Sequence, residues 1–291
     1  MGLLVNLNGV IASTGSVSVL DRGFLYGDGV YEVVRTFRGR PFGLDEHLTR
    51  LRQSAAYLYM DVPWSDAHIR TEVERTLRQA VNDESYVRIV ITRGAEDEIS
   101  LLPGDDIEPS LTIIVRPIAQ RMVLSEAGVH LQVSERLRTD RRALTPAAKT
   151  GNYLNNILAL IEARRGGADD ALLLNGDGEV TEATTSNFWL VRDGIVHTPP
   201  TEAGILHGIT RYFLLQLLRE RSIPHRETSL RPEELQTAEE AFLSSSVRLL
   251  MPVARIDDHL LPCCPGPLTR LLWEGLLEGM EAGMQAVPPP R

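Results

Sequence analysis

The single lysine of this chain is the residue whose type restricts the possible chemistry most. The 291 residues include 30 that are Lys or Arg, and only Lys149 among them is a lysine. Arginine can replace lysine as a surface cation, but a Schiff base with a carbonyl needs a primary amine that can lose its proton. A lone lysine is commonly a solvated surface residue, so composition alone leaves both interpretations open. The functional interpretation is that Lys149 is a covalent catalyst that holds an aldehyde cofactor.

Other patterns of reactive residues do not occur in the sequence. The seven histidines lack metal-ligand spacing such as H-E-x-x-H, so no metal site is expected. No G-x-x-x-x-G-K loop precedes the lysine, and no G-x-S-x-G elbow occurs. We therefore interpret the histidines as structural or solvated, although His47 and His207 lie close to the motif residues described below.

Composition excludes several classes of protein. The net charge of −9 argues against a nucleic-acid partner, which would require a basic surface. No run of 18 apolar residues occurs, and the N-terminus lacks a basic region and a cleavable apolar stretch, so neither a membrane span nor a secretion signal is expected. The adjacent Cys263 and Cys264 cannot form an ordinary framework disulfide. These features predict a cytoplasmic protein.

The spacing of apolar side chains predicts the strands and helices that position these residues. In the first part of the chain it predicts a hairpin over 5–19, a strand over 30–37, helices over 45–60 and 66–81, and strands over 86–92 and 111–115. In the second part it predicts strands over 129–134, 187–191, 195–198 and 241–244, a hairpin over 172–180, and helices over 152–165, 210–221 and 267–279. The helix over 152–165 is expected to bury an apolar face formed by Leu154, Ile157, Leu158 and Ile161.

Length and the order of the elements indicate two domains. A chain of 291 residues is long enough for about two domains, and a proline-containing connection begins at Pro117. We therefore predict a small N-terminal domain over 1–116, a linker over 117–122 and a larger domain over 123–291. Lys149 belongs to the larger domain in this division.

Six ordered blocks of sequence carry a resemblance to a known family. They read D-R-G-F-L-Y-G-D-G-V-Y-E, E-H-L-T-R-L, A-A-K-T-G-N-Y around Lys149, E-A-T-T-S-N-F-W, G-I-T-R, and S-S-S-V followed by P-V. Each block alone is moderately specific, and all six in order are highly specific. From about residue 3 to residue 279, the chain resembles the class IV aminotransferases, the fold-type IV enzymes that depend on pyridoxal phosphate.

The resemblance implies the fold and the partners. It implies an α+β fold with a smaller N-terminal α/β domain and a larger C-terminal, mixed, β-barrel-like domain with flanking helices. Pyridoxal 5'-phosphate would lie between the two domains. The substrates would be an amino acid and a 2-oxo acid, and the protein is expected to be a homodimer.

The resemblance also assigns contacts to the reactive part of the cofactor. Lys149 would bond the aldehyde, and Glu182 would face the ring nitrogen and keep it protonated. Tyr153, four residues after the lysine, would donate a hydrogen bond to the phenolic oxygen. Without the family pattern, Glu182 would be interpreted as a solvated hairpin acid and Tyr153 as a core aromatic residue of a helix face.

Four residues would bind the cofactor phosphate according to the resemblance. Arg50 matches the arginine of the family, and Ser246 is a further donor. Ile209 and Thr210 open a predicted helix, where free backbone N–H groups favour an anion, and the Thr210 hydroxyl would add a hydrogen bond. Alternatively, Thr210 is a plain helix cap and Arg50 a solvated helix residue, and the capping and phosphate roles of Thr210 are compatible.

The resemblance further implies a set of residues on the substrate side. They are expected to bind the substrate carboxylate and to line the substrate pocket: Tyr26, Tyr31, Arg35, Tyr86, Arg88, Ser246 and Val247. Tyr86 and Arg88 share one face of a predicted strand, which fits joint lining of a pocket. An arginine on a strand face is otherwise commonly an ion-paired surface group.

Short motifs favour one activity within the family and leave others open. Tyr86-Val87-Arg88 resembles the Y-I-R of branched-chain enzymes, and T-R-G-A-E-D-E lacks the R-x-H of the best-known D-amino-acid enzymes. We favour an L-branched-chain aminotransferase with a ping-pong Schiff-base mechanism. Because Val30-Tyr31-Glu32-Val33 resembles the D-amino-acid group, a D-amino-acid or (R)-amine transaminase is the alternative. An aminodeoxychorismate lyase is third, and a non-catalytic carrier of pyridoxal phosphate is the hypothesis from another class.

Overall fold

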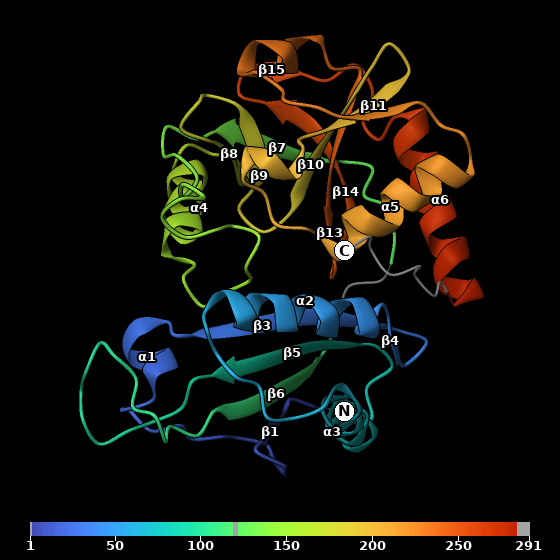
Figure 1. The fold of residues 1–291 in the computed structure, drawn as a ribbon. Helices are drawn as coiled ribbons and strands as arrows, with labels where there is room; N and C mark the ends of the chain where they lie inside the picture. Colours follow the sequence, from blue (N-terminus) through green and yellow to red (C-terminus); the bar gives the residue numbers. More distant parts are fainter. Residues whose placement is uncertain (1, 119–121, 284–291) are drawn as a thin grey trace. The chain divides into compact units, whose positions relative to one another are not determined.

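The computed structural model describes residues 2–118 and 122–283, which divide into two compact units (Figure 1). The described residues of the first unit are 2–118 and 148–152, and those of the second are 122–147 and 153–283. Part of the linker predicted over 117–122, residues 119–121, lies outside the described residues, and the predicted boundaries stay a prediction. The short segment that carries Lys149 is grouped with the first unit, although the flanking residues belong to the second.

The first unit is built on a six-stranded antiparallel sheet in the order β2-β1-β6-β5-β3-β4. Its strands are β1 (Leu4–Leu7), β2 (Val10–Ala12), β3 (Gly29–Phe37), β4 (Arg40–Pro41), β5 (Ser85–Thr92) and β6 (Ser110–Pro117). Its helices are α1 (Arg22–Tyr26), α2 (Leu44–Tyr57) and α3 (Asp66–Ala80). The predicted hairpin around Asn8-Gly9 forms as β1 and β2, but residues 13–19 continue without strand structure.

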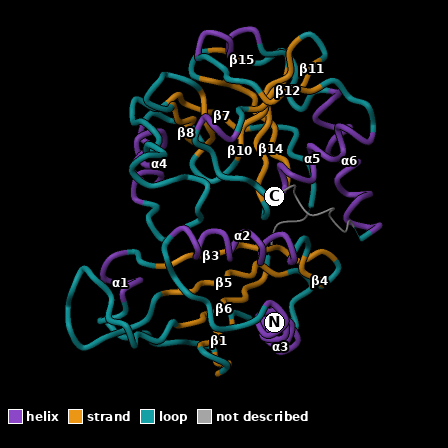
Figure 2. The backbone as a smooth tube through the Cα atoms, in the orientation of Figure 1, coloured by secondary structure: helices purple, strands orange, loops and turns teal. Residues whose placement is uncertain are grey.

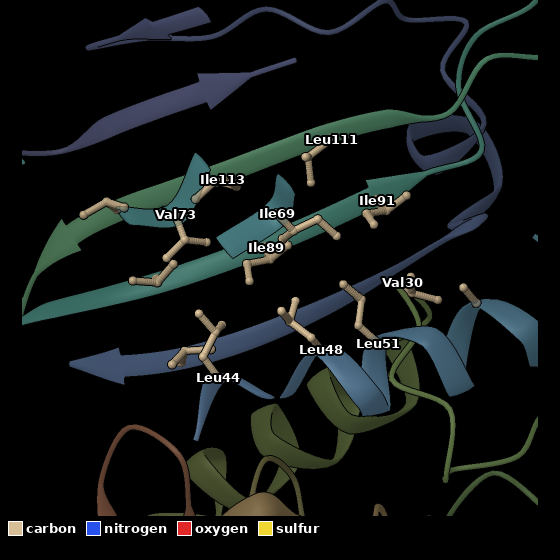
Figure 3. Close-up of a cluster of buried hydrophobic side chains, with 14 of the residues drawn as sticks. Val30, Leu44, Leu48, Leu51, Ile69, Val73, Ile89, Ile91, Leu111 and Ile113 are labelled. Carbon is tan, nitrogen blue, oxygen red and sulfur yellow. The ribbon is translucent and has the colours of Figure 1, made fainter. Parts of the chain in front are cut away.

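One face of this sheet forms the core with α2 and α3 (Figure 3). On β5 the side chains alternate, so that Val87, Ile89 and Ile91 are fully buried while Tyr86 and Arg88 on the other face are half-buried. The two helices bury their apolar stripes against these strands. The labelled part of this core comprises Val30, Leu44, Leu48, Leu51, Ile69, Val73, Ile89, Ile91, Leu111 and Ile113. The helices therefore cover one sheet face and leave Tyr86 and Arg88 on the opposite one.

The second unit contains a nine-stranded mixed sheet, part of which closes into a barrel. Its strands are drawn in orange in Figure 2. The strand order is β12-β11-β10-β13-β14-β7-β8-β9, and an additional pairing of β9 with β10 closes a ring of six strands. The strands are β7 (Val129–Val133), β8 (Asp170–Leu174), β9 (Val180–Ala183), β10 (Asn187–Arg192), β11 (Ile195–Thr198), β12 (His225–Glu227), β13 (Glu240–Ser245), β14 (Leu249–Ile256) and β15 (His259–Leu260). This confirms the α+β fold with a mixed, barrel-like second part.

Three longer helices flank the barrel: α4 (Leu154–Arg165), α5 (Ile209–Glu220) and α6 (Pro267–Ala282). Two short 3-10 turns, η1 (Thr201–Ala203) and η2 (Pro232–Thr237), complete the connections. Helices α5 and α6 pack side by side, as Figure 1 and Figure 2 show. The carboxylate of Glu240 on β13 accepts hydrogen bonds from the backbone amides of Leu268 and Thr269, which anchors the start of α6.

The expected buried face of α4 is wrong. Leu154, Ile157 and Ile161 are 66%, 48% and 42% exposed, and Leu158 is half-buried. The helix instead buries the side that carries Asn156, Ala159 and Ala163. The two alanines pack with Ala168, Ala171 and Leu173, because small side chains let the helix lie close to β8.

Candidate active site

The segment 148–152 runs beside the first residues of β3 in the first unit. The amide of Tyr31 donates to the carbonyl oxygen of Lys149 (3.0 Å), and the amide of Gly151 donates to that of Gly29 (2.9 Å). The amide of Lys149 donates to Oγ of Ser54 on α2 (3.0 Å). The backbone of the lysine is therefore held by a strand and a helix at once.

The Lys149 amine lies over an aromatic ring. Its Nζ is 4.5 Å from the ring centroid of Tyr31, and the guanidinium carbon of Arg88 is 3.8 Å from the same centroid. Tyr31 is buried, with 6% of its surface exposed. Because the face of an aromatic ring attracts cations, Tyr31 holds the amine and the guanidinium close to one ring. Three residues predicted from the sequence thus come together in the first unit.

Two more predicted residues share this face of the sheet. Tyr31 and Arg35 lie two strand repeats apart on β3, so both project on the same side, and Arg35 pairs directly with Tyr86 of β5. Arg116 of β6 is the next residue in this row, and its guanidinium carbon is 4.4 Å from the centroid of the Tyr86 ring. The face opposite the core is therefore lined by arginine and tyrosine side chains, which suit a carboxylate ligand.

Tyr26 is the last residue of α1 and lies beside a cluster of ion pairs. The guanidinium carbon of Arg22 is 5.0 Å from the Tyr26 ring centroid, and Nε of Arg22 donates to Asp28 (3.0 Å). Nε of Arg93 donates to the same carboxylate (2.7 Å). The contact of Tyr26 with Arg22 therefore lies within the D-R-G-F-L-Y-G-D block. The ion pairs of Asp28 with Arg22 and Arg93 stabilise the local fold of this block.

Arg50 makes a paired contact with a buried carboxylate that the sequence analysis did not include. Its Nε and Nη2 donate to Oε1 and Oε2 of Glu32, each at 2.7 Å, and Nδ1 of His47 is 2.6 Å from Oε2. Burial would raise the pKa of Glu32, but Arg50 and His47 outweigh it and lower this pKa to about 2. The available signal was an acid at an inward position of the apolar run V-Y-E-V-V.

Glu182 lies where the barrel of the second unit closes. It pairs with Asn187 between β9 and β10 and is buried. Its oxygens accept hydrogen bonds from Nη2 of Arg138 (2.8 Å), from Nδ2 of Asn187 (2.9 Å) and from the backbone amide of Leu206 (3.1 Å). The interpretation of this residue as a solvated hairpin acid is therefore wrong.

Arg138 and Asn156 extend the contacts of Glu182. Nη1 of Arg138 donates to Oδ1 of Asn156 (2.8 Å), and Nδ2 of Asn156 donates to the carbonyl oxygen of Thr184 (2.7 Å). Nε of Arg138 is buried and has no hydrogen-bond partner among the described residues. Arg138 lies in a loop without periodic spacing, so the sequence carries no local signal for it.

The start of α5 is held against Asn187. A Cβ atom on Gly208, which precedes the helix, would lie 1.9 Å from Oδ1 of Asn187, so only glycine fits without movement. Nδ2 of the same asparagine also donates to the carbonyl oxygen of Leu206 (2.9 Å). Ile209 and Thr210 form the first turn, in which backbone amides have no carbonyl partner within the helix. This arrangement suits the binding of an anion.

The other predicted residues of the second unit lie in two connections. Ser246 and Val247 form the turn between β13 and β14, next to Ser244, whose Oγ accepts a hydrogen bond from the buried Trp189 indole (2.8 Å). Tyr153 is half-buried at the N-terminal end of α4. The sequence predicts no element at Ser246 and Val247, and the contacts assigned to these residues and to Tyr153 stay predictions.

Residues 29–256 match the sequence pattern of the family described as amino-transferase class IV. The chain belongs to the class IV aminotransferases. Members of this family depend on pyridoxal phosphate, and its aminotransferases use amino acids and oxo acids as substrates. The motif-based recognition of the family and the prediction of an enzyme are therefore confirmed.

Relatives of this aminotransferase carry two kinds of name. A Methanocaldococcus jannaschii protein, provisionally named a branched-chain-amino-acid aminotransferase, is 37% identical over 88% of this chain and 89% of its own. The D-alanine aminotransferase of Bacillus licheniformis is 32% identical over 93% and 94%. The branched-chain amino acid aminotransferase of Thermobaculum terrenum, solved in its PLP-bound form, has a TM-score of 0.87 at 28% identity, over 95% and 93% of the two chains.

The side chains of this aminotransferase suit pyridoxal phosphate. The chain offers a primary amine at Lys149, a buried carboxylate at Glu182 and an oriented guanidinium at Arg50, which match an aldehyde, a ring nitrogen and a phosphate. The buried Nε of Arg138 is a donor of the kind that a bound polar group satisfies. Within residues 2–118 and 122–283, no cluster of three or more acidic, His or Cys side chains could hold a metal ion. In the same ranges no helix has the length and apolarity to span a bilayer.

Proposed function

We propose that this aminotransferase moves the amino group of a branched-chain L-amino acid to a 2-oxo acid, with Lys149 as the reacting amine. The observation that carries the proposal is the position of the only lysine in the sequence. Its backbone is held by β3 and α2, and its amine lies over Tyr31 beside Arg88. A lysine retained only for surface charge does not require such placement.

We assign residue roles toward pyridoxal phosphate on the basis of chemistry and family pattern. The bound cofactor would supply an aldehyde that condenses with amines and a ring that withdraws electrons from the substrate α-carbon. Nζ of Lys149 would hold the aldehyde, Glu182 would face the ring nitrogen, and Tyr153 would donate to the phenolic oxygen. The proposed phosphate ligands are Arg50, Ser246 and the first turn of α5 at Ile209 and Thr210.

Lys149 would also move the substrate proton. With the bound cofactor making the substrate α-carbon acidic, Nζ of Lys149 as a free primary amine would accept the proton from that carbon and would release it to the carbon that accepts it. Positioned proton transfer of this kind contributes about 10²–10⁴-fold to the rate. Tyr31 and the backbone bonds of Lys149 limit how far Nζ can move. Because the amino group stays on the enzyme between the two substrates, ping-pong kinetics are expected.

The substrate carboxylate would bind to the sheet face that Tyr31 and Arg88 share with Tyr86 and Arg35. Four cationic or hydroxyl-bearing side chains on adjacent strands suit an anion, and the guanidinium carbon of Arg88 is 3.8 Å from the Tyr31 ring centroid. We further propose that the backbone of Ser246 and Val247 contributes to this site. The Y-V-R motif and the branched-chain relative favour an L-branched-chain substrate.

A D-amino acid is the second candidate substrate. The D-alanine relative and the V-Y-E-V motif, which places Tyr31 under the Lys149 amine, favour this alternative. Parallel assays with L-leucine, D-alanine, 1-phenylethylamine and aminodeoxychorismate distinguish the candidates, with the oxo acid or lyase product measured. We expect L-leucine to be turned over fastest. A higher kcat/KM for D-alanine would replace the branched-chain proposal with the D-amino-acid one.

The role of Lys149 is tested by Lys149→Arg. This variant keeps the positive charge but cannot lose a proton at relevant pH, so turnover should fall by at least about 10²-fold. Borohydride treatment of the wild type with pyridoxal phosphate should fix the cofactor to residue 149, as read by peptide mass. Full turnover by the variant, or label at another residue, would remove Lys149 from its role.

We also propose that the protein is a homodimer, as the family resemblance implies. The chain mass is 32.3 kDa, so sedimentation equilibrium should give about twice this value. A mass equal to one chain at the concentrations used for activity assays would contradict the proposal.

A further inference from the structure

Helix α2 carries two buried stripes of different character. Its apolar stripe, Leu44, Leu48, Leu51 and Ala55, packs into the core of the first unit. A second stripe at spacings of three and four residues consists of His47, Arg50 and Ser54, which are 1%, 5% and 1% exposed. Burial of three polar side chains on one helix is unfavourable unless each finds a partner. The partners are Glu32 of β3 and the backbone of Lys149.

Glu32 is the anion at the centre of this stripe. It is fully buried, and its two oxygens accept hydrogen bonds from Nε and Nη2 of Arg50 at 2.7 Å each. Arg50 and His47 together keep the pKa of Glu32 near 2 despite the burial, so the carboxylate is ionised at neutral pH. Burial lowers the pKa of His47, so its ring is neutral at neutral pH. Because a carboxylate only accepts hydrogen bonds, the proton of this ring must lie on Nδ1, which faces Oε2 at 2.6 Å.

This pairing fixes the orientation of the Arg50 guanidinium. The group is planar, and two parallel hydrogen bonds from Nε and Nη2 hold that plane against the carboxylate. Nη1 lies on the opposite side of the central carbon and is therefore directed away from Glu32. His47 holds the second oxygen of the same carboxylate, so the carboxylate cannot rotate without losing a further bond.

We propose that Glu32 is a positioning residue that orients Arg50 for the phosphate of the cofactor, an inference that rests on the function proposed above. The carboxylate binds one edge of the guanidinium and thereby fixes the direction of Nη1, which would donate to the phosphate. The same stripe, through Ser54, fixes the backbone of Lys149. Thus α2 would set both the amine and the phosphate-binding group from positions 47, 50 and 54.

A purely structural role for Glu32 would give a different result. In that case, the ion pair would only fasten α2 to β3, and its loss would weaken the binding of every ligand of the site alike. Pyridoxal and pyridoxal phosphate separate the two roles, because they differ only in the phosphate. The measurement is therefore the dissociation constant of pyridoxal divided by that of pyridoxal phosphate. Both constants are obtained by absorbance titration of the full-length protein freed of cofactor.

Glu32→Gln should weaken the binding of pyridoxal phosphate about 10- to 100-fold and change that of pyridoxal less than about twofold. The matched control is Glu72→Gln on α3 in the same unit, since Glu72 is also buried, accepts a hydrogen bond from Asn6 (2.7 Å) and forms a salt bridge with Arg75 (2.9 Å). Glu72→Gln should leave the ratio of the two constants unchanged. In an Arg50→Gln background, Glu32→Gln should have no further effect on the ratio.

If Glu32→Gln does not fold, Glu32→Asp serves instead, because it keeps the charge but is one methylene too short for both partners, and it should lower the same ratio. An unchanged ratio in the folded variant, or equal weakening of both ligands, overturns the positioning role. If the wild type binds neither ligand, the proposed function itself fails, whatever the variants do.

Discussion

Side chains that react with or bind a ligand are held in place by other side chains. The reacting and binding residues can be predicted from sequence more readily than the residues that hold them. Lys149, Glu182 and Arg50 could be selected from motifs because the chemistry of an aldehyde, a ring nitrogen and a phosphate fixes their types. Glu32 and Arg138 could not, because their partners lie 18 and 44 positions away and no local spacing links them. The structure was needed to show these long-range pairs.

Arg138 provides a test of this support at Glu182. Arg138→Gln removes the ionic partner of the buried carboxylate and its link to Asn156. A charge-assisted hydrogen bond contributes about 1.5–3 kcal/mol, so kcat and the affinity for pyridoxal phosphate should each fall about tenfold or more. Arg142→Gln in the same loop is the control, since this side chain is 87% exposed and pairs only with Asp140 among the described residues. Equal kinetics for Arg138→Gln and the wild type would show that Glu182 needs no such partner.

Among the elements, most helices and strands could be predicted, and the failures have physical causes. The apolar stripe of α4 predicted the wrong buried face, because close packing on β8 selects Ala159 and Ala163 rather than the larger residues. Strand β14 was not predicted at all. It contains Pro252, which cannot donate to a sheet, yet it pairs with Phe242 of β13 and has an irregular register nearby on the side of β7. Tertiary packing overrides local preference in both elements.

The junction between β10 and α5 is an element-scale feature that one methyl group can test. Gly208→Ala would place a Cβ atom 1.9 Å from Oδ1 of Asn187, which also holds Glu182. Relief of the clash must move the helix start or the asparagine, at a cost of about 1–3 kcal/mol. The midpoint of urea unfolding should fall, and cofactor affinity should fall with it. Gly176→Ala, at a turn with no atom within 4 Å of the new methyl, should change neither the urea midpoint nor the cofactor affinity. An unchanged midpoint and affinity for Gly208→Ala would mean that the junction accommodates the methyl group without cost.

At the scale of the whole molecule, the two units have separate cores, and the chain passes from one to the other more than once. The first core joins β3, β5 and β6 to α2 and α3, and the second fills the six-stranded barrel. The 148–152 segment joins the first unit because Thr150 pairs with Val30, although the residues on both sides of the segment belong to the second. The boundary predicted at 117–122 from the order of the elements does not describe such a return, because pairing between distant segments leaves no mark in that order.

The stability of the molecule in acid depends on the buried carboxylate that α2 binds. The pKa of Glu32 is about 2 in the folded protein and 4.5 for an ordinary glutamate, so the unfolded chain binds this proton first. Its contribution, about 2–4 kcal/mol, is fully present above pH 4.5 and is lost as the pH falls from there toward 2. Urea unfolding at pH 7, 5, 4 and 3 should show a steeper loss of stability for the wild type than for Glu32→Gln. Parallel curves would mean that folding does not lower the pKa of Glu32, and the ion pair with Arg50 would then not stabilise the charged carboxylate.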